Sequence, residues 1–150
     1  MLTHASRLQT LLVRDLNSFI REVEACPDDE RLWQAAPGVT NSVGNLSLHV
    51  CGNLKHFVGQ MLGHTGYVRN RPLEFSQRAG TRAEVVAELR STIDVLERVL
   101  PSLGDDTLLA PYPETPNGKP METLLFLQHL SVHLGFHLGQ AGYLRRILTG

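Results

Sequence analysis

Two long segments of this chain contain almost no formally charged residues, yet they contain most of its histidines. Residues 41–68 include one charged side chain, that of Lys55, and residues 123–144 include none. Six of the seven histidines lie in these two segments: His49, His56, His64, His129, His133 and His137. Since a buried histidine needs a polar partner, these segments indicate where a functional site is expected.

The overall composition excludes several classes of protein. The 150 residues are too few for a dinucleotide-binding domain plus a substrate domain, so we expect a single domain over residues 1–150. The 14 lysines and arginines balance 15 aspartates and glutamates, with no block of like charge, so we expect no nucleic-acid partner. In residues 123–144, polar side chains interrupt every apolar run well short of the roughly 20 residues that a bilayer span needs.

The N-terminal region and the cysteines indicate a cellular location. Residues 1–14 lack the apolar region of a signal peptide. The two cysteines, Cys26 and Cys51, do not make a disulfide framework. We therefore expect a cytoplasmic protein without a membrane anchor, and we expect neither cysteine to be catalytic.

Helical periodicity recurs along the chain, and no segment has the pattern of a strand. The periodic segments are residues 6–25, 42–62, 81–101 and 120–148. Asn41 or Ser42 is suited to cap the second segment, and Thr81 and Glu84 have the spacing of a capping box at the third. The sequence therefore predicts an all-α protein, a four-helix bundle.

The connection between the second and third helices bears on the topology. Fully extended, residues 63–80 span about 55 Å, whereas the second helix is only about 31 Å long. A crossover running back along the bundle is therefore possible, and it would leave these two helices parallel, as in an up-down-down-up bundle. Length alone leaves the simpler up-down-up-down arrangement open.

Small residues follow the side of the fourth helix opposite its histidines: Ser131, Gly135, Gly139 and Gly142. Glycine costs on the order of 1 kcal/mol against alanine inside a helix, so these positions indicate close approach of another helix. Because the bundle interior is expected on the histidine side, we expect that helix to come from a second subunit. The alternative is a solvent-facing surface with weak helix propensity.

The histidine spacing on the fourth helix is suited to a metal ion. His129, His133 and His137 form a stripe whose outer members are about 12 Å apart, so a metal can take only an adjacent pair. Such a pair, with one imidazole from a facing helix, makes an incomplete shell that Zn, Ni, Cu or Fe accepts and that leaves a position open to water or substrate. Periodicity leaves open whether the pair is 129/133 or 133/137.

The second helix has an uncharged polar stripe that suits the lining of a polar cavity. A helix face in contact with solvent usually has lysine and glutamate, and this one has none. The alternative is that the stripe faces water. Its members are Ser42, Asn45, His49, Asn53, His56 and Gln60.

Three short motifs resemble the DinB/YfiT-like superfamily of metal-binding four-helix bundles. They are Asn41-Ser-Val-Gly-Asn-Leu-Ser-Leu-His49, His133-Leu-Gly-Phe-His137-Leu-Gly-Gln140 and Tyr143-Leu-Arg-Arg146. The resemblance covers essentially the whole chain and implies an up-down-down-up bundle, usually a homodimer. It also implies a divalent metal, often Zn or Ni, held by three histidines, which by motif are His49, His133 and His137.

The resemblance also implies a class of chemistry. Characterised relatives include bacillithiol-dependent S-transferases and a mycothiol-dependent maleylpyruvate isomerase, so we expect a metal-dependent enzyme that transfers or uses a low-molecular-weight thiol and takes a small electrophile. A metal with an open position can hold a thiol as its thiolate, which is the nucleophilic form. The competing function is a non-catalytic metal-binding or stress-response homodimer.

Several other polar residues are candidates for the lining of the site. Asn45, Asn53 and Gln140 are candidates to orient the substrate. His129 is a candidate pocket residue, with an ordinary packed histidine as the alternative. We expect His56 on the polar face and assign no role to the histidines at positions 4 and 64.

Overall fold

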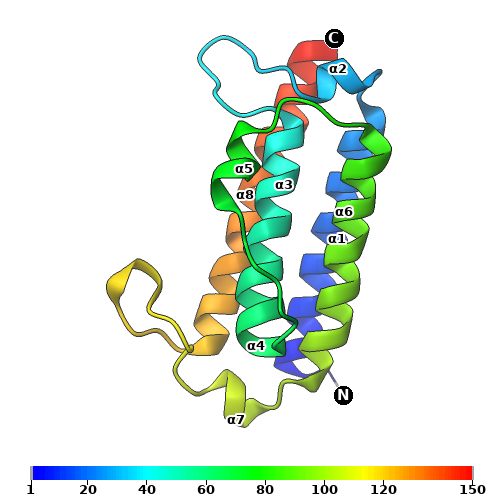
Figure 1. The fold of residues 1–150 in the computed structure, drawn as a ribbon. Helices are drawn as coiled ribbons and strands as arrows, with labels where there is room; N and C mark the ends of the chain where they lie inside the picture. The colour runs from blue at the N-terminus through cyan, green and yellow to red at the C-terminus, as the bar shows by residue number, and fades with distance from the viewer. Residues whose placement is uncertain (1, 150) are drawn as a thin grey trace.

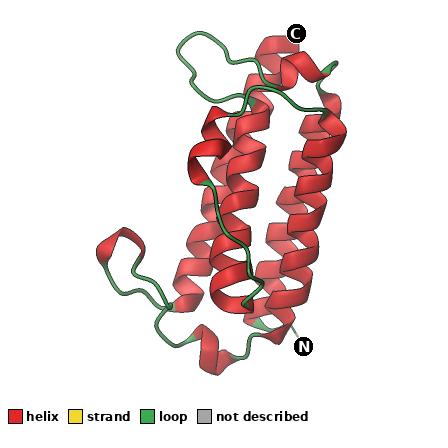
Figure 2. Ribbon diagram, in the orientation of Figure 1, coloured by secondary structure: helices red, strands yellow, loops and turns green. Residues whose placement is uncertain are grey.

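The computed structural model describes residues 2–149, and helices dominate them (Figures 1 and 2). Within those residues there is no strand, and an isolated bridge pairs Pro111 with Glu122. The predicted all-α class is confirmed. The long helices are α1 (His4–Ala25), α3 (Val43–Leu54), α6 (Arg82–Val99) and α8 (Thr123–Thr149). The shorter ones are α2 (Asp29–Leu32), α4 (Met61–Gly63), α5 (Arg71–Ser76), α7 (Asp105–Leu108) and the single turns η2 (Leu100–Ser102) and η3 (Pro116–Gly118).

The long helices lie side by side and enclose one core (Figure 1). In this view α1 rises, α3 descends, α6 descends and α8 rises, so α3 and α6 point the same way. The connection after α4 returns along the outside of α3 and forms α5 on its way to α6. A returning connection was one of the two arrangements that its length left open, and the short helix α5 within it was not predicted.

Local signals set the beginnings of two of these helices. Thr81 Oγ1 accepts from the backbone N–H of Glu84 at 3.1 Å, and Glu84 Oε2 accepts from the N–H of Thr81 at 2.9 Å. The predicted capping box at α6 is therefore present. Of the two candidates at α3, Ser42 is the cap, and its hydroxyl accepts from the N–H of Asn45 at 3.0 Å.

The long helix after Ser42 changes its winding partway along. Residues Lys55–Gln60 form a π-helical stretch, η1, between α3 and α4. The predicted helix over residues 42–62 is thus a continuous run of three segments, Val43–Leu54, Lys55–Gln60 and Met61–Gly63. The Tyr112 hydroxyl donates to the carbonyl oxygen of Phe57 at 2.6 Å, which holds the loop before α8 against this stretch.

Two of the three glycines of α8 face a helix of the same chain. A Cβ added at Gly135 would lie 3.6 Å from Asp15 Oδ2, and one at Gly142 would lie 3.5 Å from Glu22 Oε1, both on α1. At Gly135 and Gly142 the approaching helix is therefore α1 of the same chain, and the expectation of a second subunit there is wrong. Its error was to place the bundle interior on one side of α8, whereas α8 packs against α1 as well as α3. At Gly139 nothing lies within 4 Å of an added Cβ.

None of the helices within residues 2–149 has both the length and the apolar character that crossing a membrane would need.

Candidate metal centre

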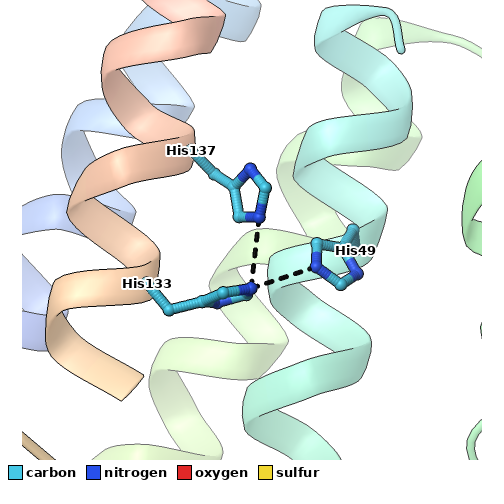
Figure 3. A group of neighbouring side chains, drawn as sticks. All are labelled: His49, His133 and His137. Atoms are coloured by element: carbon cyan, nitrogen blue, oxygen red, sulfur yellow. Dashed lines mark hydrogen bonds between the residues drawn. The ribbon is translucent and has the colours of Figure 1, made fainter. Parts of the chain in front are cut away.

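Three histidines from two helices point at one another between α3 and α8 (Figure 3). His49 lies on α3, and His133 and His137 lie on successive turns of α8. The Nε2 atom of His133 is 3.2 Å from Nε2 of His49 and 3.1 Å from Nε2 of His137. One ligand atom from each ring lies within 4.8 Å of the others. Of the two pairs that periodicity left open, the structure brings the 133/137 pair to His49.

This arrangement fits a divalent metal ion. Nitrogen ligands at zinc-like bond lengths and tetrahedral angles stand about 3.4 Å apart, close to both Nε2–Nε2 distances. Burial, together with the neighbouring rings of His137 and His49, lowers the pKa of His133 to about 4. Burial also lowers the pKa of His137. These two rings are therefore neutral at pH 7, which is the form that binds metal.

A buried carboxylate fixes the orientation of the His49 ring. Glu74, on α5, places Oε1 at 3.0 Å from His49 Nδ1. Burial alone would raise the pKa of Glu74, but hydrogen bonds from His49 and Arg69 outweigh it and lower that pKa. Because the ionised carboxylate only accepts, Nδ1–H of His49 donates to it, and Nε2 keeps its lone pair for a metal. A carboxylate behind a histidine is typical of metal ligands.

Arg69 and Gly52 hold that carboxylate in place. Arg69 donates through Nε to Glu74 Oε2 at 2.8 Å and through a terminal nitrogen to Oε1 at 2.9 Å. Its side chain is largely buried, so this two-bonded pair is shielded from solvent. A Cβ at Gly52 would overlap the carboxylate, so the absence of a side chain on α3 makes room for Glu74.

Gln140 orients the His137 ring as Glu74 orients the His49 ring. Its Oε1 lies 2.7 Å from Nδ1 of His137, one turn along α8. With Nδ1–H donated to this oxygen, Nε2 of His137 faces the other two rings. Gln140 thus orients one ring of the three-histidine group, and the substrate role expected for it stays a prediction.

A family model for the DinB superfamily matches residues 11–141, which include all three histidines, Glu74 and Gln140. The chain belongs to the DinB superfamily. The resemblance noted in the sequence is therefore confirmed, and it now rests on most of the chain instead of three motifs. No curated protein matches this sequence.

Glu74 and Arg69 were not predicted from the sequence of this DinB-superfamily protein. Both lie in residues 63–80, the long connection in which no helix was expected. The available signal was indirect: a histidine buried in an uncharged helix needs a polar partner, and this connection is the nearby segment that has acidic and basic residues. Their contact with His49 depends on how the chain returns along α3, and local sequence patterns do not predict that path.

A small cavity of about 240 Å³ opens beside the histidines. Two of the candidate substrate residues, Asn53 and His129, line it. His129 is exposed and lies outside the three-histidine group. The other lining residues include Phe57, Arg69, Arg71, Asn117 and Phe126 as well as His49 and His133.

Asn45 has a different place from the one expected for a substrate contact. Its amide nitrogen donates to the carbonyl oxygens of Glu74, at 3.0 Å, and Gln77, at 2.9 Å. It is not among the residues that line the cavity. The side chain therefore ties the end of α5 to α3 and so helps to position Glu74.

The remaining histidines and the cysteines stand apart from the centre. His56 Nε2 is 2.8 Å from Glu114 Oε1, in the loop before α8. Cys51 is buried, and burial raises its pKa to about 12. Burial likewise raises the pKa of Cys26. Both thiols are therefore protonated at pH 7, as expected for cysteines without a nucleophilic role.

Proposed function

We propose that this DinB-superfamily protein is a divalent-metal-dependent enzyme that transfers or uses a low-molecular-weight thiol. The observation that supports this proposal is the group of three histidines with no fourth protein ligand, next to a cavity. Among the described residues, no carboxylate or thiol joins the group. Structural zinc sites are closed by four protein ligands, whereas three protein ligands and an open position are typical of catalytic sites.

The roles of the chain's own residues follow from their geometry. His49, His133 and His137 would hold the ion, with Zn or Ni as our first candidates. When bound, such an ion supplies a positive charge that stabilises a coordinated thiol as its nucleophilic thiolate. Glu74 and Gln140 keep two of the rings in the binding tautomer, and the cavity next to the histidines takes the organic part of the thiol or the electrophile.

The direct test combines metal content with thiol transfer. Protein purified without an affinity tag is analysed for metals and then assayed with several thiols and a chloronitrobenzene electrophile, in which a carbon–sulfur bond replaces carbon–chlorine. We expect metal-dependent turnover that is lost in His133→Ala. If metal-loaded protein consumes none of the thiols, the alternative function is favoured, a non-catalytic metal-binding or stress-response protein.

We also propose that the protein is a homodimer, as the resemblance implies, associated through the outer face of α8. Large apolar side chains on that face are well exposed, with Val132 at 71%, Phe136 at 62% and Tyr143 at 72%. Such a patch on a small protein is typical of an interface. Light scattering should give a mass near twice 16.6 kDa, and Phe136→Glu with Tyr143→Glu should give the monomer mass. A monodisperse wild-type monomer would contradict the dimer.

A cytoplasmic location remains our proposal for the protein. Its support is that Cys26 and Cys51 are both free and buried, which suits a reducing compartment.

A further inference from the structure

One residue that lines the cavity beside the histidines has a polar atom that the described part of the chain leaves unpaired. Asn53 Oδ1 is buried and has no hydrogen-bond partner among residues 2–149, and the whole residue is only 7% exposed. An unpaired buried acceptor has lost its hydrogen bonds to water without replacement, so such atoms are rare unless something else completes them. Asn53 lines the same cavity as His49 and His133.

The position of Asn53 relates this atom to the metal centre. Asn53 follows His49 by four residues on α3, so the two side chains lie on the same face about 6 Å apart along the helix axis. A small ligand that reaches the three histidines with one end therefore has its next few atoms near Asn53. Because Oδ1 is an acceptor, the ligand group that completes it has to be an N–H or an O–H donor.

The charge around the cavity adds a second requirement. Arg69 and Arg71 line it, and no acidic residue does. The charge of Arg69 is balanced by Glu74, with which it forms two hydrogen bonds. Arg71 forms no ion pair within residues 2–149, and its guanidinium lies 5.2 Å from the centre of the Phe75 ring, which in turn packs on His49. The rim of the cavity therefore has one unbalanced positive charge.

We propose that Asn53 and Arg71 form a binding subsite for a thiol that has both a carboxylate and a hydrogen-bond donor. Its sulfur faces the three histidines, Asn53 Oδ1 accepts from its N–H or O–H, and Arg71 pairs with its carboxylate. This subsite rests on the proposed thiol chemistry of the centre and names the class of thiol. Phe75 is close to both parts of this arrangement, with its ring centre 5.2 Å from the Arg71 guanidinium and 4.8 Å from the centre of the His49 ring.

The test compares thiols that differ in one group. N-acetyl-L-cysteine and N-acetylcysteamine differ by the carboxylate alone, and 3-mercaptopropionate has the carboxylate without the amide N–H. Each is titrated into cobalt-loaded protein, and the dissociation constant is read from the thiolate-to-cobalt absorption band. We expect N-acetyl-L-cysteine to bind about three- to tenfold more tightly than N-acetylcysteamine, as expected for a partly exposed ion pair.

Variants of Arg71 and Asn53 test which residue recognises which group of the thiol. Arg71→Gln should remove the difference in affinity between the two N-acetyl thiols and leave the affinity for N-acetylcysteamine unchanged. The control is Arg146→Gln, on the exposed end of α8, which should leave the affinities for both N-acetyl thiols unchanged. Asn53→Leu should weaken both N-acetyl thiols and leave 3-mercaptopropionate unaffected. Cobalt content and circular dichroism show whether each variant still folds and binds metal, and Asn53→Ala serves if the leucine variant does not.

The outcomes separate the subsite from the function on which it rests. Equal affinities for the two N-acetyl thiols, or a preference that persists in Arg71→Gln, overturn the subsite while the thiol chemistry stands. Absence of the absorption band with every thiol overturns the proposed function, and the subsite with it.

Discussion

The carboxylate of Glu74 occupies the space that a side chain at position 52 would need. An added Cβ at Gly52 would overlap Glu74 Oε2, so α3 and α5 approach closely only because this position is glycine. That approach brings the carboxylate to His49 Nδ1 and lets Arg69 donate to both of its oxygens. A backbone requirement on α3 is thereby coupled to the orientation of a ring in the metal centre.

Gly52→Ala should therefore impair metal binding without touching a ligand. The added methyl group displaces Glu74, His49 loses the partner that fixes its ring, and we expect metal affinity to fall about 10- to 100-fold, the usual cost of losing such a partner. Affinity is measured by competition with a chelator of known strength. A Gly52→Ala protein that binds metal as tightly as the wild type would contradict this role.

A matched control for that substitution exists on α8. Gly139 is also helical, and an added Cβ there meets nothing within 4 Å. Gly139→Ala should leave metal affinity unchanged and raise the free energy of unfolding by about 0.5–1 kcal/mol, the gain in helix propensity.

Single substitutions should distinguish the histidines that bind the metal from those that do not. His49→Ala, His133→Ala and His137→Ala should each sharply reduce bound metal, because each removes one of three ligands. His129→Ala and His56→Ala should retain most of it, since neither residue belongs to the group. The measurement is metal per chain by mass spectrometry after dialysis. Full stoichiometry in His133→Ala would falsify the assignment.

The sequence predicted the long helices well because their signals are local. Apolar periodicity lies within each segment, and the caps at Ser42 and Thr81 involve residues three apart. It did not predict α5, because six residues are too short to display a period. The sequence also did not predict which helix covers the glycine side of α8. A helix in a bundle has two neighbours, and the pattern of Gly135 and Gly142 is the same whichever of them approaches.

The site was predictable to the level of the three histidines and no further. The motif resemblance chose His133 and His137 over the pair that includes His129, a choice that helix geometry alone left open. The partner of His49 depends on a return of the chain along α3, so Glu74 and Arg69 are twenty or more residues away in sequence and adjacent only in space. Asn53 was selected for its place on the polar stripe, but its lack of a partner is a property of the packed structure.

The metal-free protein should lose stability as the pH falls from about 6.5 toward 4. The pKa of His133 is about 4 in the folded protein, below its ordinary value of 6.5, and the pKa of His137 is also lowered. Between these values the unfolded chain takes up protons that the folded chain does not, so the free energy of unfolding is highest above pH 6.5 and decreases through this window. Urea denaturation at pH 7, 6 and 5 measures it.

His133→Gln is the control for that pH dependence. Without an ionisable ring at this position, the variant should show a shallower decrease between pH 7 and 5 than the wild type does. An equally steep decrease in both proteins would mean that the protonation of other groups dominates.

Asn53→Leu should stabilise the metal-free protein while it weakens ligand binding. The wild-type side chain buries an acceptor without a partner among residues 2–149, and leucine has similar size and no polar atom to desolvate. Replacing an unsatisfied buried polar group by an apolar one of similar shape is neutral or stabilising, so we expect the free energy of unfolding to rise by about 1 kcal/mol. Urea denaturation of metal-free protein measures the change.

Asn45→Leu is the informative comparison for Asn53→Leu. The Asn45 amide donates to the carbonyl oxygens of Glu74 and Gln77, and loss of these hydrogen bonds should destabilise the fold. A loss of stability in Asn53→Leu as large as that in Asn45→Leu would mean that Asn53 is a structural residue, held for packing and not for a ligand.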